Sequence, residues 1–312
     1  MKIIMRQEVD IKGHPLPLEF LGKKLGAHCS PLQMMTLWQQ TMDSLKLAME
    51  SAIPDISVHM PRLGEIDKTK KQLLDELEGF VVSMDSYDTT GSFELQVSRH
   101  FMPRGKQQCI LPLGRRPGSI ALDQQIKQVV VAAKGQPILL VDDDTFTGGT
   151  AAHIITLLRA AGLEVNVFMV GTQAEDTKNI LGVPIVAIEK DPDVFDIVDP
   201  RDLLFGMKDG GLVINNNNVL SRVPWIWPWV DLHARCGMPE SAQRKFSTEI
   251  TKLNMKLFTN LEKIFETSIL AEDMDQPFQD FVSEYTDFGI TMRMTDFCSA
   301  TKNLILNTVN IK

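Results

Sequence analysis

Residues 138–152 carry acids, threonines and glycines in an order that suits the binding of a phosphorylated sugar. Four apolar residues, ILLV, come first, and Asp142 and Asp143 follow them directly. The run TFTGGT then leads into AAHIITLLRAAG, whose apolar spacing predicts a helix. Glycines let backbone N–H groups approach an anion, and the first turn of a helix has N–H groups without partners. The loop could therefore hold a phosphate while the two carboxylates accept hydrogen bonds from ribose hydroxyls.

This segment lacks the signatures of two common phosphate-binding loops. No lysine follows Gly149, as a Walker A loop requires, and the glycines are not spaced as GxGxxG. The segment instead resembles the phosphoribosyl-pyrophosphate (PRPP) motif of the type I phosphoribosyltransferases, in which four apolar residues and two acids precede a Thr/Gly-rich loop. The resemblance implies that Asp142 and Asp143 hold the ribose 2′- and 3′-hydroxyls. It assigns the 5′-phosphate to Thr147, Gly148, Gly149, Thr150 and Ala151.

The resemblance also implies a reaction and its cofactor. Transfer from PRPP passes through an oxocarbenium-like centre at C1′ and releases pyrophosphate, with Mg²⁺ bridging pyrophosphate and ribose oxygens. Asp142 and Asp143 are the expected catalytic residues and the only direct protein ligands expected for the metal. Phe146 stands where purine-type members often place an aspartate that handles the base proton, which argues against purine salvage. The alternative is a non-catalytic sensor or regulator that binds PRPP or a nucleotide with the same fold.

Two segments compete for the role of the pyrophosphate loop. Arg115 and Arg116 lie in LGRRPGS, between a predicted strand and a predicted helix. The other candidate is DSYDTTG at residues 85–91, an acidic turn after a strand, with residues 99–106 as a flexible basic hood. An acidic chain needs local cations to hold a polyanion, and either segment would bring them.

Three tryptophans, Trp225, Trp227 and Trp229, alternate in VPWIWPWV. In an extended segment all three rings would face one side and could form a wall against which an aromatic acceptor stacks. Phe146 and Trp225 are the candidates for stacking on the acceptor. The alternative is a hydrophobic seam that joins the C-terminal helices to the sheet, and the large area that three such rings bury favours it.

The predicted elements place the PRPP-like segment at the carboxyl end of a strand. Alternating strands and helices predict a parallel sheet, and such sheets bind their ligands at the carboxyl ends of the strands. A hairpin is predicted from strands at 80–87 and 93–101. Further strands are predicted at 109–114, 137–143, 163–172 and 183–190, and a strand–turn–strand in the Gly/Asn-rich stretch after residue 205. Helices are predicted at 31–52, 67–78, 120–135, 151–162, 240–268 and 290–308.

These elements divide the chain into three expected regions. Residues 1–79 would form a largely helical extension, residues 80–205 a phosphoribosyltransferase-like α/β core, and residues 206–312 a Trp-bearing helical region that packs on the core. The expected fold class is α/β, with a Rossmann-like parallel sheet of the type I phosphoribosyltransferase kind and added N- and C-terminal helical segments.

The composition limits the classes of partner that we expect the chain to bind. It has 312 residues, of which 44% are hydrophobic, and a net charge of −8, which disfavours nucleic acid but permits a small polyanion accompanied by Mg²⁺ and local arginines. No apolar run reaches the roughly 20 residues that span a bilayer. The four cysteines form no CxxC pair. We therefore expect a cytoplasmic transferase of nucleotide metabolism that binds a phosphorylated sugar, without a membrane or nucleic-acid partner, and with a homodimer as one option.

Overall fold

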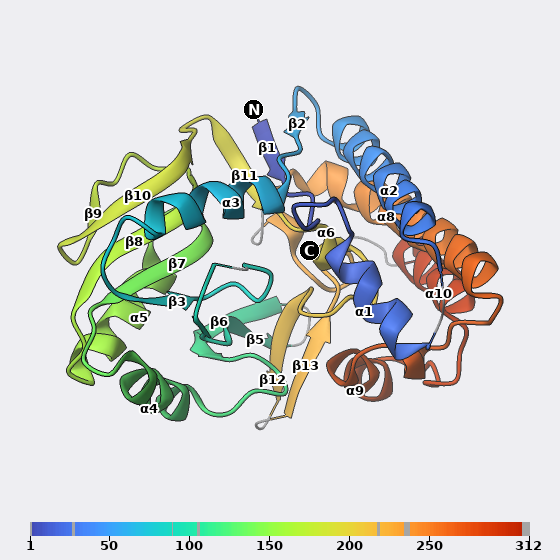
Figure 1. Ribbon diagram of the computed structural model, residues 1–312. Helices are drawn as coiled ribbons and strands as arrows, with labels where there is room; N and C mark the ends of the chain where they lie inside the picture. Colours follow the sequence, from blue (N-terminus) through green and yellow to red (C-terminus); the bar gives the residue numbers. More distant parts are fainter. Residues whose placement is uncertain are drawn as a thin grey trace. The chain divides into compact units, whose positions relative to one another are not determined.

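The computed structural model describes residues 2–26, 29–88, 90–104, 107–216, 219–233 and 238–307. The chain folds into two compact units, each built from segments that are distant in sequence (Figure 1). Unit 1 consists of Met1–Met60, His100–Leu111 and Phe195–Lys312, and unit 2 of Pro61–Arg99 and Pro112–Val194. These boundaries differ from the three consecutive regions expected from the sequence, because residues 61–79 join the α/β unit while residues 100–111 and 195–205 belong to the other unit.

Unit 2 contains a six-stranded, largely parallel sheet, which confirms the expected α/β class with a parallel sheet. Its order is β4-β3-β7-β8-β10-β9, and only β9 runs antiparallel to its neighbour. Numbered along the chain, the five parallel strands follow the order 2-1-3-4-5, which is a doubly wound arrangement. The strands are β3 (Phe80–Ser83), β4 (Phe93–Glu94), β7 (Ile138–Thr145), β8 (Val165–Gln173), β9 (Asn179–Ile180) and β10 (Val183–Lys190).

Helices cover both faces of this sheet, which explains why β7 begins with four consecutive apolar residues. On one face, Ile138 and Leu140 pack in a core with α4 (Leu122–Ala133) and α5 (Gly149–Ala160). On the other face, Leu139 and Val141 pack with Leu74 of α3 (Leu63–Leu74). Figure 1 shows α3 on the side of the sheet opposite to α4 and α5. The predicted helix at 67–78 therefore exists but starts and ends four residues earlier.

The hairpin predicted from residues 80–101 is wrong. β3 and β4 pair in parallel, with Val82 opposite Phe93, and β5 (Val97–Arg104) belongs to a different sheet. The connection between β3 and β4 is too long for a tight hairpin turn and crosses over before it returns alongside β3. Gly91 permits the close return, because a Cβ there would lie 2.7 Å from the Cβ of Ser83.

Unit 1 combines two sheets with a group of long helices. One sheet has the order β11-β1-β2 and the other the order β13-β12-β5-β6. The expected strand–turn–strand after residue 205 is present, because β12 and β13 pair in antiparallel fashion. The strands are β1 (Lys2–Met5), β2 (Ser57–His59), β6 (Gln107–Arg115), β11 (Val194–Val198), β12 (Leu212–Asn216) and β13 (Val219–Val223).

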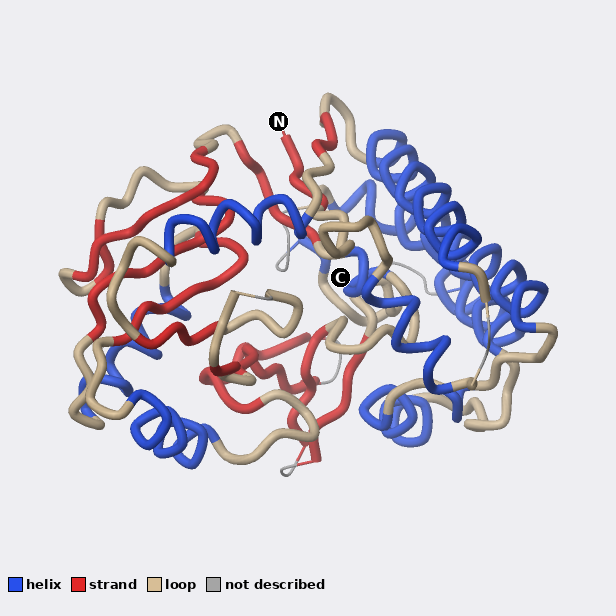
Figure 2. Tube along the Cα trace, in the orientation of Figure 1, coloured by secondary structure: helices blue, strands red, loops and turns tan. Residues whose placement is uncertain are grey.

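The helices of unit 1 pack around one hydrophobic core. The predicted helices at 31–52, 240–268 and 290–308 correspond to α2 (Pro31–Ala52), α8 (Glu240–Phe265) and α10 (Met294–Asn307). These three lie side by side (Figure 2) and bury apolar residues that recur at helical spacing. Unit 1 also contains shorter helical segments, among them α1 (Leu16–Lys24), α6 (Pro200–Leu203), η1 (Ala271–Asp273) and α9 (Gln276–Tyr285).

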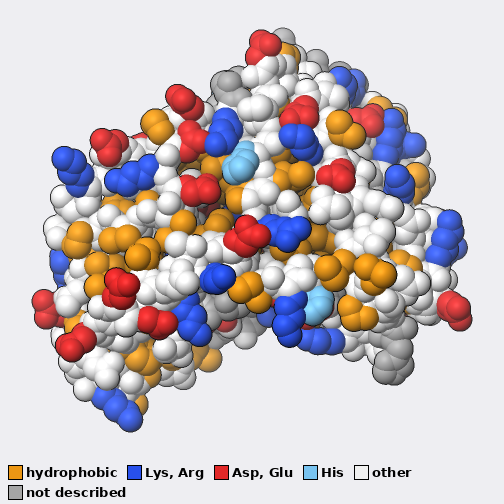
Figure 3. Space-filling model, turned by 45° about the horizontal axis from the view of Figure 1, so that its top comes forward, with side chains coloured by type: hydrophobic (Ala, Val, Ile, Leu, Met, Phe, Trp, Pro, Cys, Tyr) orange, Lys and Arg blue, Asp and Glu red, His pale blue; other side chains and the backbone are white. Residues whose placement is uncertain are grey.

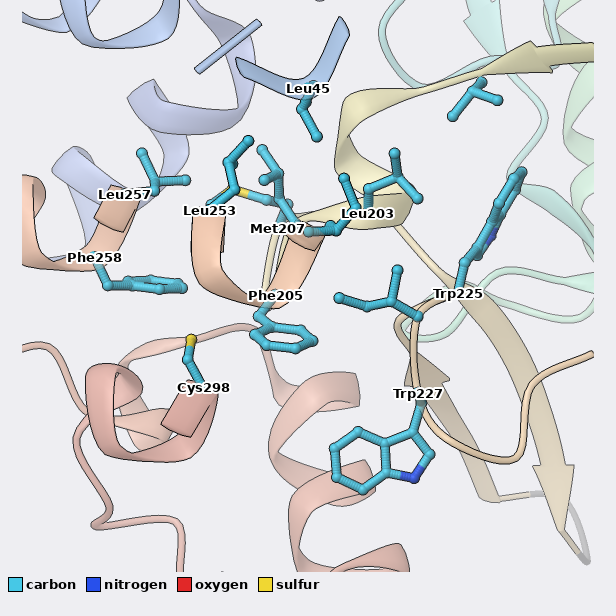
Figure 4. Packing of buried hydrophobic residues seen from close by; sticks show 14 of the residues in the cluster. Leu45, Leu203, Phe205, Met207, Trp225, Trp227, Leu253, Leu257, Phe258 and Cys298 are labelled. Carbon is cyan, nitrogen blue, oxygen red and sulfur yellow. The ribbon is translucent and has the colours of Figure 1, made fainter. Parts of the chain in front are cut away.

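The tryptophan segment forms turns between residues 225 and 229, so it is not the extended wall considered above. Trp225 is 1% exposed and Trp227 is 4% exposed, and both belong to the core of unit 1 (Figure 4). The ring of Trp227 meets Phe281 of α9 edge-on at 4.9 Å and stacks on Phe297 of α10 at 5.9 Å. The hydrophobic-seam interpretation fits these contacts, and the buried ring of Trp225 offers no face on which an acceptor could stack.

Within the described residues, no helix combines the length and apolar character needed to cross a membrane. On the face drawn in Figure 3, acidic and basic side chains are interspersed, so the negative net charge is not gathered into one broad area of that face. Cys29 and Cys298 are free thiols, and burial raises the pKa of Cys298 well above its usual value.

Candidate functional site

The strand order of unit 2 reverses between β3 and β7, which are adjacent and in register at Ser83 and Val141. From this point the following strands are added in opposite directions, and doubly wound proteins bind their ligands at such a reversal point. Asp142 and Asp143 follow Val141 directly and are half-buried. The acid pair singled out from the sequence therefore lies at the reversal point.

Acids from two separate segments gather at this point. The pKa of Asp142 is raised well above its usual value, first by burial and then by the charges of Asp143, Asp144 and Asp85. Asp85 follows β3 and is 3% exposed. The acid pair is also held in place locally, since the Asp143 N–H donates to Asp142 Oδ1 at 3.0 Å and the Asp144 N–H donates to Asp143 Oδ1 at 2.7 Å. Such a cluster favours ligands that donate hydrogen bonds or carry positive charge.

The acid cluster does not by itself form a metal cage. Among the residues that the structure describes, no three His, Cys, Asp or Glu side chains are grouped as metal ligands. Mg²⁺ commonly keeps several waters and takes one or two carboxylates together with substrate phosphates. Asp142 and Asp143 fit that mode of binding, in which a phosphorylated ligand supplies most of the remaining oxygens.

The predicted phosphate loop is a short turn between β7 and α5. The helix begins at Gly149, two residues before the start expected from the sequence, and its first internal bond runs from the Ala152 N–H to the Gly148 oxygen at 2.8 Å. The N–H groups of residues 149–151 consequently have no acceptor within the helix. Gly148 has a φ of +71°, and Thr147 and Gly149 are exposed. The loop thus presents amide donors and a hydroxyl beside the acid pair.

Phe146 is half-buried at the start of this loop, and Thr150 is also half-buried. Arg99 reaches the same loop, because its Nη2 donates to Thr150 Oγ1 at 3.4 Å. Arg99 was expected only as part of a basic hood over residues 99–106. The structure instead places one cation of that segment directly at the phosphate loop, while residues 105 and 106 lie outside the described residues.

The two candidate pyrophosphate segments meet in the structure. Arg116 donates from Nη2 to the Met84 oxygen at 3.0 Å and from Nε to the Val97 oxygen at 2.9 Å. It therefore supports the chain where residues 85–91 begin, although Thr89 of that segment lies outside the described residues. Arg115 donates to the backbone oxygen of Ser119 in its own loop. Both guanidinium groups are engaged by backbone oxygens, and Arg116 is the one that lies next to the reversal point.

Sequence reasoning missed Lys70, a residue of α3 that is fully buried. Its Nζ pairs with Asp67 and Asp88 and lies 3.4 Å from the backbone oxygen of Asp142. Burial lowers the pKa of Lys70, but the charges of Asp88 and Asp67 outweigh that effect and raise it. The sequence did hold a signal: Ile66 and Leu74 flank Lys70 at four residues on either side, which places the lysine on the apolar stripe of the helix.

Comparison with known proteins shows no family for the chain. No protein-family model, curated protein or solved structure matches the chain.

Proposed function

We propose that this protein binds PRPP with Mg²⁺ at the carboxyl end of β7 and transfers its phosphoribosyl group to an acceptor nucleophile, with release of pyrophosphate. The observation that carries the proposal is the placement of an acid pair and a Thr/Gly-rich turn that opens a helix at the reversal point of a doubly wound sheet. Capping a helix requires one polar side chain, so the combination of two acids and TGGT calls for a ligand with both hydroxyls and a phosphate.

Each part of the ligand then has a partner. The carboxylates of Asp142 and Asp143 accept hydrogen bonds from the ribose hydroxyls. The N–H groups of residues 149–151 and the hydroxyls of Thr147 and Thr150 hold the 5′-phosphate at the positive end of the α5 dipole. Arg99, which already contacts Thr150, adds a positive charge beside that phosphate.

The transfer replaces one bond at C1′ by another. The bond from C1′ to pyrophosphate breaks and its electron pair leaves with pyrophosphate, while a lone pair of the acceptor forms the new bond. Bound Mg²⁺ would neutralise part of the negative charge of the pyrophosphate. The protein holds the ribose at Asp142 and Asp143. Arg116 donates a hydrogen bond to the Met84 oxygen and so supports the start of the segment at 85–91.

Calorimetry with PRPP and Mg²⁺ tests this proposal on the wild type and on Asp142→Asn and Asp143→Asn. We expect each substitution to weaken binding by about 10- to 100-fold, because each removes a charge-assisted hydrogen bond to a ribose hydroxyl. Glu164→Gln is the matched control, since Glu164 is an exposed acid at the opposite, amino end of β8 and should leave the affinity unchanged. Absence of PRPP binding to the wild type would overturn the proposal.

A non-catalytic PRPP or nucleotide sensor is the second candidate. Phe146 carries no carboxylate where a base-handling acid could act, and Arg115 and Arg116 are engaged by backbone oxygens. These features favour binding without transfer. Incubation with PRPP, Mg²⁺ and a panel of bases and amines separates the two candidates: pyrophosphate release supports the transferase, and binding without release supports the sensor.

A further inference from the structure

The buried ammonium of Lys70 contacts three separate segments of unit 2. Its Nζ lies 3.2 Å from Asp67 Oδ1 on α3 and 3.4 Å from the backbone oxygen of Asp142 at the carboxyl end of β7. It also forms an ion pair with Asp88, which belongs to the connection between β3 and β4. One side chain therefore links the covering helix, the β3–β4 connection and the acid pair of the proposed site.

This arrangement is a costly way to gain stability. The side chains of Lys70 and Asp88 have no exposed surface, and that of Asp67 is 5% exposed. Taking one ammonium and two carboxylates out of water carries a large desolvation penalty, and apolar residues of similar size often stabilise a core as well or better. The cluster also carries a net negative charge when all three groups are ionised. A role in fixing a particular geometry explains its presence better than a role in stability.

The geometry that the cluster fixes is the position of the β3–β4 connection. Its two ends are held by backbone bonds, from the Met84 N–H to the Val141 oxygen at 2.9 Å and from the Ser92 N–H to the Val81 oxygen at 2.9 Å. Between these ends, Asp88 accepts a hydrogen bond from the Thr90 N–H at 2.7 Å and also one from the Thr90 hydroxyl. Asp88 thus organises the middle of the connection, and its ion pair with Lys70 ties that middle to α3.

We propose that Lys70 is a positioning residue that sets where the β3–β4 connection lies relative to Asp142, and thereby the geometry of the site for PRPP and Mg²⁺. The ligand part of this inference rests on the proposed function. The positional part concerns the ligand-free protein and stands independently. Lys70 acts through Asp88 and the Asp142 backbone and does not itself contact the ligand.

Three variants isolate the link. Lys70→Gln removes the ammonium, Asp88→Asn removes the carboxylate but keeps an oxygen for Thr90, and the double variant K70Q/D88N replaces the ion pair by two amides that can hydrogen-bond to each other. In Lys70→Gln both Asp67 and Asp88 lose the ammonium that they share, whereas in the double variant only Asp67 does, so the double variant keeps the test usable if Lys70→Gln folds poorly. The matched control is K127Q/D123N, an ion pair on α4 with an N–O distance of 3.5 Å whose side chains are 77% and 69% exposed.

The first measurement needs no ligand: amide hydrogen exchange of Thr90, compared with Leu140 and Phe168 in the paired strands β7 and β8. In Lys70→Gln we expect exchange at Thr90 to speed up by about tenfold, the effect of losing one ordinary hydrogen bond. Exchange at Leu140 and Phe168 should stay unchanged, and the double variant should slow Thr90 again. Unchanged exchange at Thr90 would overturn the proposal. An equal increase at all three amides would overturn it too, because it would show a loss of global stability only.

The second measurement is the affinity for PRPP with Mg²⁺. We expect Lys70→Gln to weaken binding by about 10- to 100-fold through misplacement of the site, with partial recovery in K70Q/D88N and no change in the control. Recovery by the second substitution separates positioning from damage to the fold. Unweakened binding in Lys70→Gln would overturn the link to the ligand site. If the wild type binds no PRPP, the proposed function fails, and the exchange at Thr90 alone decides the positional part.

Discussion

Gly148 is the residue of the phosphate loop whose replacement has the most definite consequence. Its φ of +71° is a conformation that an alanine adopts at a cost of roughly 1–2 kcal/mol. A Cβ at this position would also overlap Ile180 Cδ1 and lie 2.9 Å from Ile180 Cγ1. Overpacking of this kind costs about 1–3 kcal/mol. We therefore expect Gly148→Ala to lower the free energy of unfolding by about 2–5 kcal/mol.

The neighbouring glycine provides the control. A Cβ on Gly149 would meet only Thr147 Oγ1, at 3.8 Å, and Gly149 is the first residue of α5. Gly149→Ala should therefore change the free energy of unfolding by no more than about 1 kcal/mol, and an alanine in the helix favours stabilisation. Both variants are measured by denaturant unfolding against the wild type. Equal stability of Gly148→Ala and Gly149→Ala would refute the reasoning.

The steric part of the effect can be separated from the backbone part. Ile180→Val removes the Cδ1 atom that a Cβ on residue 148 would overlap. Alone it should cost about 1 kcal/mol, because Ile180 is 6% exposed and packs in the core of unit 2. Combined with Gly148→Ala it should cost less than the sum of the two single changes. Strict additivity would show that the clash with Ile180 contributes nothing.

Two further predictions concern unit 1. Burial raises the pKa of Asp275 to about 6 against the opposing charge of Arg222, so the folded protein retains a proton that the unfolded chain loses between about pH 4 and 6. As the pH rises through that window, Asp275→Asn should gain stability relative to the wild type, by at most about 3 kcal/mol. A difference in the free energy of unfolding between the two proteins that does not change with pH would contradict this. Trp227→Ala should lower the free energy of unfolding by about 3–5 kcal/mol, because it removes the contacts with Phe281 and Phe297. Trp229→Ala should lower it distinctly less, because Trp229 is only half-buried. Equal losses in thermal unfolding would disprove that difference.

The sequence predicted the parts of the fold that depend on local spacing. The apolar run ahead of Asp142, the glycine turn and the periodic stretch after it predicted a buried strand, a loop and a helix, and β7 and α5 lie there with small shifts of their ends. Helices α2 and α8 were predicted for the same reason, since Ser30 and Pro31 mark one start and an apolar stripe runs along the other. The assignment of PRPP as the ligand stays a prediction from the resemblance and the geometry of the loop.

The predictions that failed depended on partners that are distant in sequence. Residues 80–101 contain two runs rich in strand-forming residues on either side of a turn, as in a hairpin, but β4 pairs in parallel with β3, and β5 pairs with β12 in another sheet. Strand pairing is decided by which apolar faces can be covered together, and local pattern carries little of that information. Trp225 illustrates the same limit, because its ring could have faced either a ligand or the core until the packing of unit 1 was known.

The sequence by itself determined the chemistry available at the candidate site: a pair of carboxylates, a glycine turn with threonine hydroxyls, and the start of a helix, all within residues 142–151. These features are local, because neighbouring residues in a strand–turn–helix segment are placed by their own backbone preferences. Only the tertiary structure decided what surrounds them. It brought Asp85 close to Asp142 and placed the Arg116 guanidinium in a hydrogen bond with the Met84 oxygen. It also buried Lys70 in contact with Asp67 and Asp88. Such contacts arise from the packing of α3 and the crossing of the β3–β4 connection, and those depend on the whole sheet.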